Sequence, residues 1–367
     1  MSEKEIKEHQ LFISSYPVIY RLWRDNKERI TKKKMFFKIL LFTTISAPFR
    51  WVQKILYQRR INKINLNQKP PVFVIGHWRS GTTHLHYLLA QDQRFSFLEA
   101  FQAFFFRAAL VSRIFMKPIL NKLMPKTRPQ DNVEINASAP TEEEHSLTNL
   151  THMSGMQSFF FPQNLSYFSE YNLFETSPEN ITKWKYIYDK MLKQIAFYNG
   201  KNRQLLLKNP HNTGRIKILK ELYPNAKFIF IHRNPYEVFN STQHLYRTTI
   251  KSQFLQDFGE QEINERVLLG YEKTMMAYLE QRHEIDKENL IEISYNELSE
   301  QPMNCIENIY RTLKIGDFTE VKTNFQKYLD NQKNYKKNTF NPVPSELKNQ
   351  INNRWAFAFE AWDYEMN

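Results

Sequence analysis

The stretch that most restricts how this chain can fold is PPVFVIGHWRSGTTHLHYLL, residues 70–89. It opens with Val72–Ile75, a short continuous apolar run that is typical of a strand buried in a parallel sheet. Gly76 and Gly81 then frame a tight loop, and we expect a helix over Thr82–Gln91. In such a unit the loop N–H groups and the helix N-terminus point at one spot. The segment therefore predicts an anion-binding site.

The chemistry of the loop narrows the kind of anion. Gly76-x4-Gly81-Thr82-Thr83 has the glycine spacing of nucleotide-triphosphate loops, which need a lysine after the second glycine and a hydroxyl for magnesium. Thr82 takes the lysine position, and Arg79 is the cation of this loop. Because an arginine fork suits several oxygens of one group, the residues predict a phosphate or sulfate held without a metal. The alternative is a purely structural strand–helix connection.

Three further apolar runs repeat the order of strand and helix, at Gln204–Lys208, Lys227–His232 and Asn289–Ser294. Such alternation predicts an α/β domain, residues 67–367, with a P-loop-like parallel β-sheet flanked by helices on both faces. Residues 1–66 are basic and lack glycine, and we expect a helical N-terminal extension packed on the core or on a membrane surface. Further helices are expected near 180–198, 213–222, 303–313 and 354–363, and a loop over 327–350.

The net charge of the chain limits the classes of partner that it can bind, but it does not select one class. A formal net charge of +13 suits nucleic acid, an anionic membrane surface or a polyanionic small ligand. Most of the 51 Lys and Arg residues are equally explained as solvated side chains on helix faces. The single cysteine, Cys305, excludes a disulfide framework within one chain. With no signal-peptide pattern in the first 30 residues, we expect a cytoplasmic protein.

An apolar segment near the N-terminus lies between basic clusters. Residues 35–49 (MFFKILLFTTISAPF) include Lys38, and their uncharged run is shorter than the ~20 residues that span a bilayer. RITKKK precedes this segment, and Arg59-Arg60 follows it. The pattern fits a helix on an anionic membrane, which would give residues 35–60 a peripheral contact with the inner face of a membrane. It also fits an ordinary helix docked under the core.

Four ordered blocks resemble one enzyme family. GHWRSGTTHLHYLL (76–89) resembles the 5′-phosphosulfate loop of sulfotransferases, in particular the bacterial family and the tyrosylprotein sulfotransferases. Cytosolic sulfotransferases carry a lysine where this chain has Arg79. The segments LLLKNPHNTGRIKILKELYPNAKFIFIHRNP (205–235), HRNPYEVFNS (232–241) and ISYNELSEQP (293–302) are similar to further blocks of the family, in the same order. The resemblance covers about residues 70–315. His77-Trp78 departs from it, because many members have a proline before the arginine.

The resemblance implies a sulfuryl donor and its binding residues. The donor would be 3′-phosphoadenosine-5′-phosphosulfate (PAPS), the product 3′,5′-adenosine bisphosphate (PAP), and no metal is implied. Arg233 and Ser241, eight residues apart, match the arginine and serine that hold the 3′-phosphate. Tyr295 matches a tyrosine that contacts the adenine, and Lys336 or Lys337 is a further candidate for the nucleotide. The residues expected around the 5′-phosphosulfate are Arg79, Ser80, Gly81, Thr82 and Thr83.

Lys208 is the candidate catalytic lysine. It ends a predicted strand, where it can stabilise charge that builds on the bridging oxygen as the donor bond breaks. The lysine of the resembling block does this in the family. The alternative is a solvated lysine at a strand end.

The base that takes the acceptor proton has two candidates. PTEEEH (140–145) resembles an acidic block of the bacterial family, and Glu142 and His145 are spaced to share one helix face. Glu144 has a structural explanation, a capping box with Thr141. The second candidate is Glu99, which lies near the position of the glutamate in tyrosylprotein sulfotransferases.

Two aromatic segments are expected to build the acceptor pocket, FQAFFFRAALVSRIF (101–115) and MSGMQSFFFPQN (153–164). Their phenylalanines favour a lipophilic alcohol, such as a sterol or a lipid, although most of them also suit a hydrophobic core. A glycan or peptide acceptor stays open. The rival functions are a P-loop kinase, which would need magnesium, and a nucleotide- or nucleic-acid-binding protein, which would bind in a salt-dependent way. The resemblance implies no nucleic acid partner, and the oligomeric state stays open.

Overall fold

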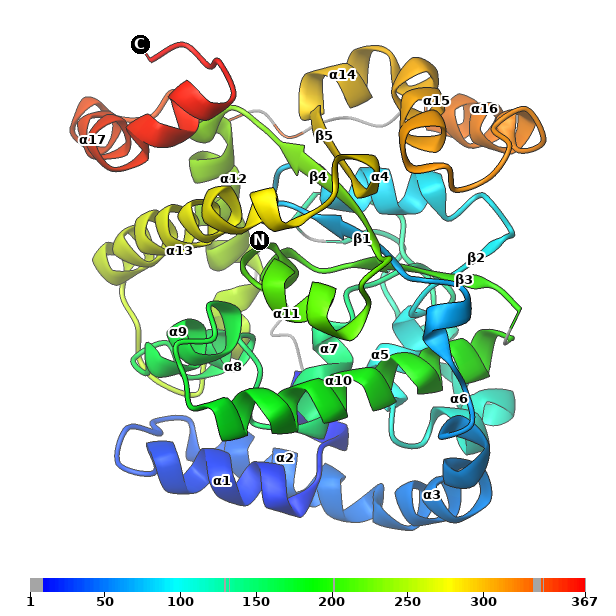
Figure 1. Ribbon diagram of the computed structural model, residues 1–367. Helices are drawn as coiled ribbons and strands as arrows, with labels where there is room; N and C mark the ends of the chain where they lie inside the picture. Colours follow the sequence, from blue (N-terminus) through cyan, green and yellow to red (C-terminus); the bar gives the residue numbers. More distant parts are fainter. Residues whose placement is uncertain are drawn as a thin grey trace.

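A five-stranded parallel sheet forms the centre of the molecule (Figure 1). The structure, a computed structural model, describes residues 9–128, 130–131, 133–200, 202–332, 338 and 340–366. The strand order is β2-β3-β1-β4-β5, and all the pairings are parallel. The strands are β1 (Val72–Ile75), β2 (Phe95–Ser96), β3 (Gln204–Lys208), β4 (Lys227–His232) and β5 (Leu290–Ser294). The predicted α/β fold with a parallel sheet is confirmed.

Successive side chains of each strand enter different cores, because strand side chains alternate between the two faces of a sheet. Phe73, Ile75 and Phe230 face the larger core, which they share with α10, α12, α13 and α17. Val74, Ile229 and Ile231 face the smaller core, with α4 and α15. Both faces are therefore apolar, which explains why β1 and β4 are continuous hydrophobic runs rather than alternating ones.

The helices that follow the strands position the site. α4 (Thr82–Leu89) follows β1, and α12 (Pro235–Thr248) follows β4. α14 (Tyr295–Glu300) and α15 (Pro302–Leu313) follow β5. The other helices after residue 99 are α5 (Ala100–Phe105), α6 (Ala109–Leu123), α7 (Glu144–Leu150), α8 (Gln157–Phe160), α9 (Ser166–Asn172), α10 (Pro178–Asn199), α11 (Ile216–Leu222), α13 (Glu260–Gln281), α16 (Lys322–Asn331) and α17 (Ser345–Ala361). The 3-10 turns are η1 (Gln10–Ile13), η2 (Leu66–Gln68), η3 (Pro210–Gly214), η4 (Ile250–Gln253), η5 (Arg282–Glu284) and η6 (Lys287–Asn289).

The N-terminal extension is helical, as predicted, over its described part. α1 (Tyr16–Asn26), α2 (Lys33–Ile45) and α3 (Ala47–Ile61) line one side of the molecule, opposite α14–α17 (Figure 1). Leu11, Ile19 and Leu22 are buried in the larger core, so the extension packs on the rest of the chain. Within the described residues, no single helix is long and apolar enough to cross a membrane. The pair α2 and α3, bent by 44°, passes that test only when the two are taken together.

Three local predictions were incomplete. Residues 327–350 were expected to be a loop, yet α16 extends to Asn331 and α17 begins at Ser345. α16 was missed because its sequence is mostly polar and only Phe325 is buried. The long helix α13 was also missed, as was β2, an edge strand of only two residues.

Candidate functional site

The predicted site residues meet at one edge of the sheet. The loop 76–81 follows β1, Lys208 ends β3, Arg233 follows β4 and Tyr295 follows β5. Because all these strands run parallel, their carboxyl ends share an edge, and ligands of open α/β sheets bind there. Parallel pairing, with Val74 opposite Lys208, brings residues from distant parts of the chain together.

The loop after β1 depends on its two glycines. Gly76 (φ 140°) has no room for a side chain, since a Cβ would lie 2.3 Å from the carbonyl oxygen of Ile231. At Gly81 (φ 98°) a Cβ would lie 2.5 Å from the ring of Tyr295. Gly81 is the N-cap of α4, so the first N–H groups of that helix lack intrahelical partners and can face an anion.

Arg79 links the loop to α12. It adopts a positive φ of 71°, and its Nε donates to Oγ of Ser241 at 2.8 Å. Nη1 of Arg233 donates to the Arg79 carbonyl oxygen at 3.3 Å. The sequence assigned Arg79 and Ser241 to different phosphates of the donor. Because the two side chains are hydrogen-bonded, a single phosphate group can reach both.

A pocket of about 290 Å³ opens beside this loop. The guanidinium of Arg233 lies over the ring of Tyr295, 4.3 Å from its centroid. We call this space the donor pocket. Its lining includes the predicted residues Arg79, Gly81, Thr82, Thr83, Arg233 and Tyr295, together with Tyr87, Asp131 and Tyr328 from other elements.

Asp131 is a charged residue of the donor pocket that the sequence analysis missed. Its Oδ2 accepts from Nη1 of Arg79 at 2.8 Å, and it also forms an ion pair with Arg128. Burial alone would raise the pKa of Asp131, but the two guanidinium groups lower it to about 2. Asp131 therefore stays ionised and orients Arg79. The short spacing of Arg128 and Asp131 in KTRPQDN was the available signal, although it does not name Arg79 as the partner.

Lys208 and Glu142 form an ion pair beside Thr83, a residue that lines the donor pocket. Nζ of Lys208 donates to Oε1 of Glu142 at 2.5 Å, and Oγ1 of Thr83 lies 3.4 Å from the same nitrogen. The Lys208 side chain is only 2% exposed and that of Glu142 17%. Burial would raise the pKa of Glu142, but the Lys208 ammonium holds it below its usual value. An ionised carboxylate and a cation thus lie side by side next to the predicted phosphosulfate loop.

The segment PTEEEH differs from its prediction in detail. α7 begins at Glu144, so Glu142 precedes the helix and does not share a helix face with His145. The N–H of His145 donates to the Glu142 carbonyl oxygen at 3.2 Å, and within the described residues its Nδ1 is buried without a hydrogen bond. The capping box of Thr141 and Glu144 is wrong: the N-cap is Glu143, and no side chain caps the helix.

Glu99, the other candidate base, has different partners. Its Oε2 pairs with Nζ of Lys117 at 2.7 Å, and with Gln102 it forms a capping box at the start of α5. Its backbone bridges to Pro140, two residues before Glu142. Glu99 therefore lies near the segment 140–145, but its carboxylate is held toward α6.

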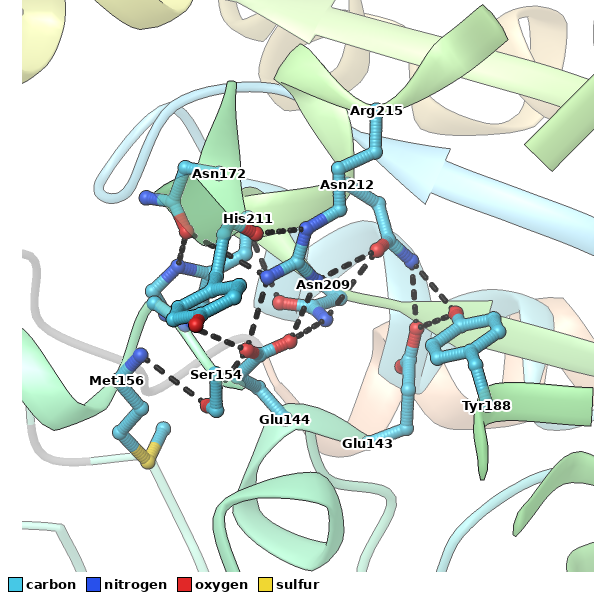
Figure 2. A network of polar contacts seen from close by, with 12 residues as sticks. Glu143, Glu144, Ser154, Met156, Asn172, Tyr188, Asn209, His211, Asn212 and Arg215 are labelled. Carbon is cyan, nitrogen blue, oxygen red and sulfur yellow. Dashed lines mark hydrogen bonds and ion pairs between the residues drawn. The ribbon is translucent and has the colours of Figure 1, made fainter. Parts of the chain in front are cut away.

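A buried network holds Glu143 and Glu144 against the residues that follow Lys208 (Figure 2). The carboxylate of Glu144 forms a fully buried ion pair with Arg215, at 2.6 Å and 2.9 Å. It also accepts from Nδ2 of Asn209 and from Ser154. Because Asn209 directly follows Lys208, this network fixes α7 and the end of β3 relative to each other.

Glu143 belongs to the same network, but its hydrogen-bond partners are uncharged side chains. Tyr188 and Asn212 both donate to its Oε1, at 2.8 Å and 2.7 Å. Its Oε2 is buried with no hydrogen-bond partner among the described residues. Burial raises the pKa of Glu143 to about 7. The consecutive carboxylates Glu142, Glu143 and Glu144 thus have three different environments, which their sequence alone does not reveal.

An apolar cavity of about 570 Å³ lies between the N-terminal helices and α5 and α6. The segment 101–115 contributes Phe104, Phe105 and Phe115, as predicted, but 153–164 contributes no lining residue. η1 and α2 complete the wall, and none of the lining residues is Asp, Glu, Lys or Arg. Gln10 lines the cavity, and its Nε2 donates to the carbonyl oxygen of His145 at 3.1 Å. The cavity wall is therefore one hydrogen bond away from the segment 140–145.

Two further sequence predictions concern ligands. Lys337 lies outside the described residues, as does Lys336. Among the residues that the structure describes, no group of three or more His, Cys, Asp or Glu side chains is placed to hold a metal ion.

Comparison with known proteins decides the family. Residues 70–320 match the sequence pattern of the sulfotransferase family, a range that contains every donor-pocket residue up to Pro302. The chain belongs to the sulfotransferase family. It is similar to the omega-hydroxy-beta-dihydromenaquinone-9 sulfotransferases Stf3 of Mycobacterium bovis and Mycobacterium tuberculosis, each 29% identical over 94% of this chain and 88% of theirs.

Solved structures agree on the fold of this sulfotransferase. Sulfotransferase STF9 from Mycobacterium avium superposes with a TM-score of 0.68 over 87% of this chain and 82% of its own, at 18% identity. Sulfotransferase STF1 from Mycobacterium tuberculosis gives a TM-score of 0.58 over 84% of both chains, at 16% identity. The predicted sulfotransferase fold and enzyme class are confirmed.

Proposed function

We propose that this sulfotransferase moves a sulfuryl group from PAPS to the hydroxyl of a lipophilic alcohol. The observation that carries this proposal is that two unlike pockets both reach the region of Lys208 and Glu142. Thr83 of the donor pocket lies 3.4 Å from Lys208, and Gln10 of the apolar cavity is hydrogen-bonded to His145. The donor pocket is rich in cations and loop N–H groups, whereas the apolar cavity has no charged lining residue. A donor with phosphates suits the first pocket, and an acceptor with a long apolar body suits the second.

The donor-pocket residues fit the groups of PAPS. Arg79 and the N–H groups at the start of α4 would hold its anionic oxygens, and Arg233 with Ser241 would hold the 3′-phosphate. Tyr295 offers a ring that packs against Gly81 and lies under Arg233. When bound, PAPS supplies a sulfuryl group that is already activated for transfer.

The pair Lys208 and Glu142 supplies the remaining chemistry. The Lys208 ammonium neutralises the charge that develops on the leaving phosphate oxygen. The Glu142 carboxylate, ionised and adjacent, accepts the proton of the acceptor hydroxyl as its oxygen bonds to sulfur. The carbonyl oxygen of His145, three residues after Glu142, accepts a hydrogen bond from Gln10, which lines the apolar cavity. Glu99 is the alternative base, and its ion pair with Lys117 disfavours it.

A lipid acceptor has support from a relative as well as from the cavity. The relatives that are 29% identical are sulfotransferases of omega-hydroxy-beta-dihydromenaquinone-9. The acceptor of this chain would share its chemistry, a hydroxyl on a long apolar molecule, without having to be the same compound. A glycan would need polar groups along the cavity, and the lining offers few, among them His9, Gln10 and Ser112.

The test is an acceptor panel with the purified protein and PAPS. We expect sulfate esters on detergent-solubilised isoprenoid or sterol alcohols and none on soluble sugars or tyrosyl peptides. Turnover of the soluble acceptors alone would overturn the lipophilic acceptor and restore a glycan or peptide. Turnover of no acceptor, together with magnesium-dependent ATP consumption, would overturn the sulfuryl-transfer proposal itself.

A further inference from the structure

The outer surfaces of α2, α3 and α6 expose an unusual amount of apolar side chain. Of the 21 large hydrophobic residues that are exposed in the described chain, five lie on α2, five on α3 and four on α6. Trp51, Ile55 and Ile114 are 73%, 77% and 82% exposed. The three helices are neighbours, since the rings of Phe49 and Phe115 lie 6.2 Å apart. We call this surface the α2–α3–α6 face. A contiguous apolar patch of this kind marks an interaction site.

The charged side chains that α2, α3 and α6 themselves carry are all basic. The sequence contains no Asp or Glu from residue 29 to residue 91, nor from residue 100 to residue 130. The same helices carry exposed basic side chains, namely Lys33, Lys34, Lys38, Lys54, Arg59, Arg60, Arg113 and Lys122. An apolar surface whose own helices carry only basic charges matches the surface of a bilayer that contains anionic lipids. A second copy of the face would bring these cations against one another.

We propose that the α2–α3–α6 face docks on the surface of an anionic lipid bilayer. Trp51 and Ile55 enter the interface region of the lipid, and the lysines and arginines contact the headgroups. Phe49 and Phe115 belong both to this face and to the lining of the apolar cavity, so the cavity mouth lies at the proposed membrane surface. A lipophilic alcohol would then pass from the bilayer to the catalytic pair without crossing water. The docking itself does not depend on which acceptor is used.

The first test is vesicle co-sedimentation without donor or acceptor. We expect binding to phosphatidylcholine vesicles that contain phosphatidylglycerol, and much weaker binding to phosphatidylcholine alone. Replacing Trp51 and Ile55 by serine together should weaken binding ~10–100-fold, because each loses the transfer energy of a large apolar side chain. Met276→Ser, which removes an exposed apolar residue on α13, is the matched control and should bind like the wild type.

The outcomes of the vesicle test are distinct. No vesicle binding by the wild type, or equal binding by the Trp51/Ile55 variant, would overturn the proposal. So would a wild-type dimer that becomes a monomer in that variant, because the face would then be covered by a second copy. If the proposed acceptor is wrong but docking is right, vesicle binding persists while lipid alcohols are not sulfated.

A separate pocket next to this face carries a second inference. About 380 Å³ in volume, it lies between α1, α3 and α10 and is lined by four cations, Arg50, Lys54, Arg107 and Lys190, with no Asp or Glu. Arg50 is 6% exposed, and its Nη1 is fixed by the carbonyl oxygen of Thr43. Arg107 has no carboxylate partner within the described residues, and burial together with nearby Arg50 lowers its pKa to about 10.

The geometry points to a binding site for a phosphate-type anion between Arg50 and Arg107. The carbonyl of Phe106, which precedes Arg107, accepts from Gln53 at 3.0 Å and from Gln194 at 2.6 Å, so the backbone at this point is held by buried side chains. Two guanidinium groups that line one pocket without a carboxylate suit phosphate oxygens. The phosphate can belong to a lipid headgroup or be free in solution.

The experiment measures thermal unfolding with the donor pocket saturated by PAP, so that added phosphate cannot act there. A ligand that binds only the native state raises the midpoint. We expect a rise with inorganic phosphate or with dihexanoyl phosphatidic acid, lost in Arg107→Gln and retained in Arg107→Lys. A rise with phosphate indicates a free anion, and a rise with the lipid alone indicates a headgroup. No rise, or an equal rise in Arg107→Gln and in the exposed-lysine control Lys63→Gln, would overturn the site.

Discussion

The donor pocket and the apolar cavity share no lining residue, and they are built in different ways. The donor pocket is made from the ends of parallel strands, whose register fixes Lys208, Arg233 and Tyr295 within one small space. The apolar cavity is made from η1, α2, α3, α5 and α6, which are joined by side-chain packing and by hydrogen bonds of single side chains such as Gln53. The register of paired strands can change in few ways, whereas packed helices can shift relative to one another in many ways. We therefore expect the donor pocket to accept few donors and the apolar cavity to accept acceptors of several shapes.

The largest expected effect comes from removing the pair on which both sides converge. Lys208→Met should lower kcat ~10²–10³-fold, because it removes the cation that faces the leaving oxygen. Affinity for PAP should change little. The measurement is single-turnover transfer with saturating donor, beside Lys217→Met, an exposed lysine on α11, as control.

Glu142→Gln should lower kcat by a similar factor, and Glu99→Gln should lower it much less. The reverse order would make Glu99 the base.

A second change should affect both pockets at once through stability. Arg215→Met leaves the Glu144 carboxylate buried without its partner, and should lower the free energy of unfolding by ~3–5 kcal/mol. Chemical denaturation measures this loss. Arg247→Met, which breaks an exposed pair with Glu260, should cost less than about 1 kcal/mol. Equal losses in the two variants would show that the buried network does not hold the site together.

A third change should separate the two pockets. Met116→Glu places a charge in the apolar cavity, so the KM for a lipophilic acceptor should rise ~10–100-fold, because a carboxylate is costly to bury there. The affinity for PAP should stay the same, because no residue lines both the donor pocket and the apolar cavity. Steady-state kinetics with each substrate varied in turn checks this. A loss of donor affinity as well would mean that the two pockets are not independent.

The smallest expected effect concerns pH. The folded protein raises the pKa of Glu143 to about 7, above its ordinary value of 4.5. It therefore binds more protons than the unfolded chain between those values, and stability falls as pH rises through this window. Glu143→Gln keeps the acceptor for Tyr188 and Asn212, so it should remove ~1–3 kcal/mol of that pH dependence. Denaturation at pH 5 and at pH 8 measures it. An unchanged slope would mean that Glu143 is not protonated in the native state.

The sequence was informative where local rules determine geometry. The glycine spacing and strand pattern predicted the loop of Gly76 and Gly81, and the family resemblance added Arg233 and Ser241 in their correct neighbourhood. It could not show that Asp131 holds Arg79, because that contact depends on how a loop folds over the pocket. Nor could it separate Glu142, Glu143 and Glu144, since burial and partners decide their charge states. The sequence predicted the part of the apolar-cavity wall that comes from residues 101–115. It did not predict η1 and α2, because they reach the cavity only through tertiary packing.

We propose that the donor pocket holds an adenosine that carries one phosphate on its 3′ oxygen and another on its 5′ oxygen. The most direct measurement is thermal unfolding with PAP, with ATP and magnesium, and with 5′-AMP, in the wild type and in Arg233→Ala. The account predicts a rise in the midpoint with PAP, a much smaller rise with 5′-AMP, and loss of the PAP effect in Arg233→Ala. A rise with ATP and magnesium and none with PAP would contradict it.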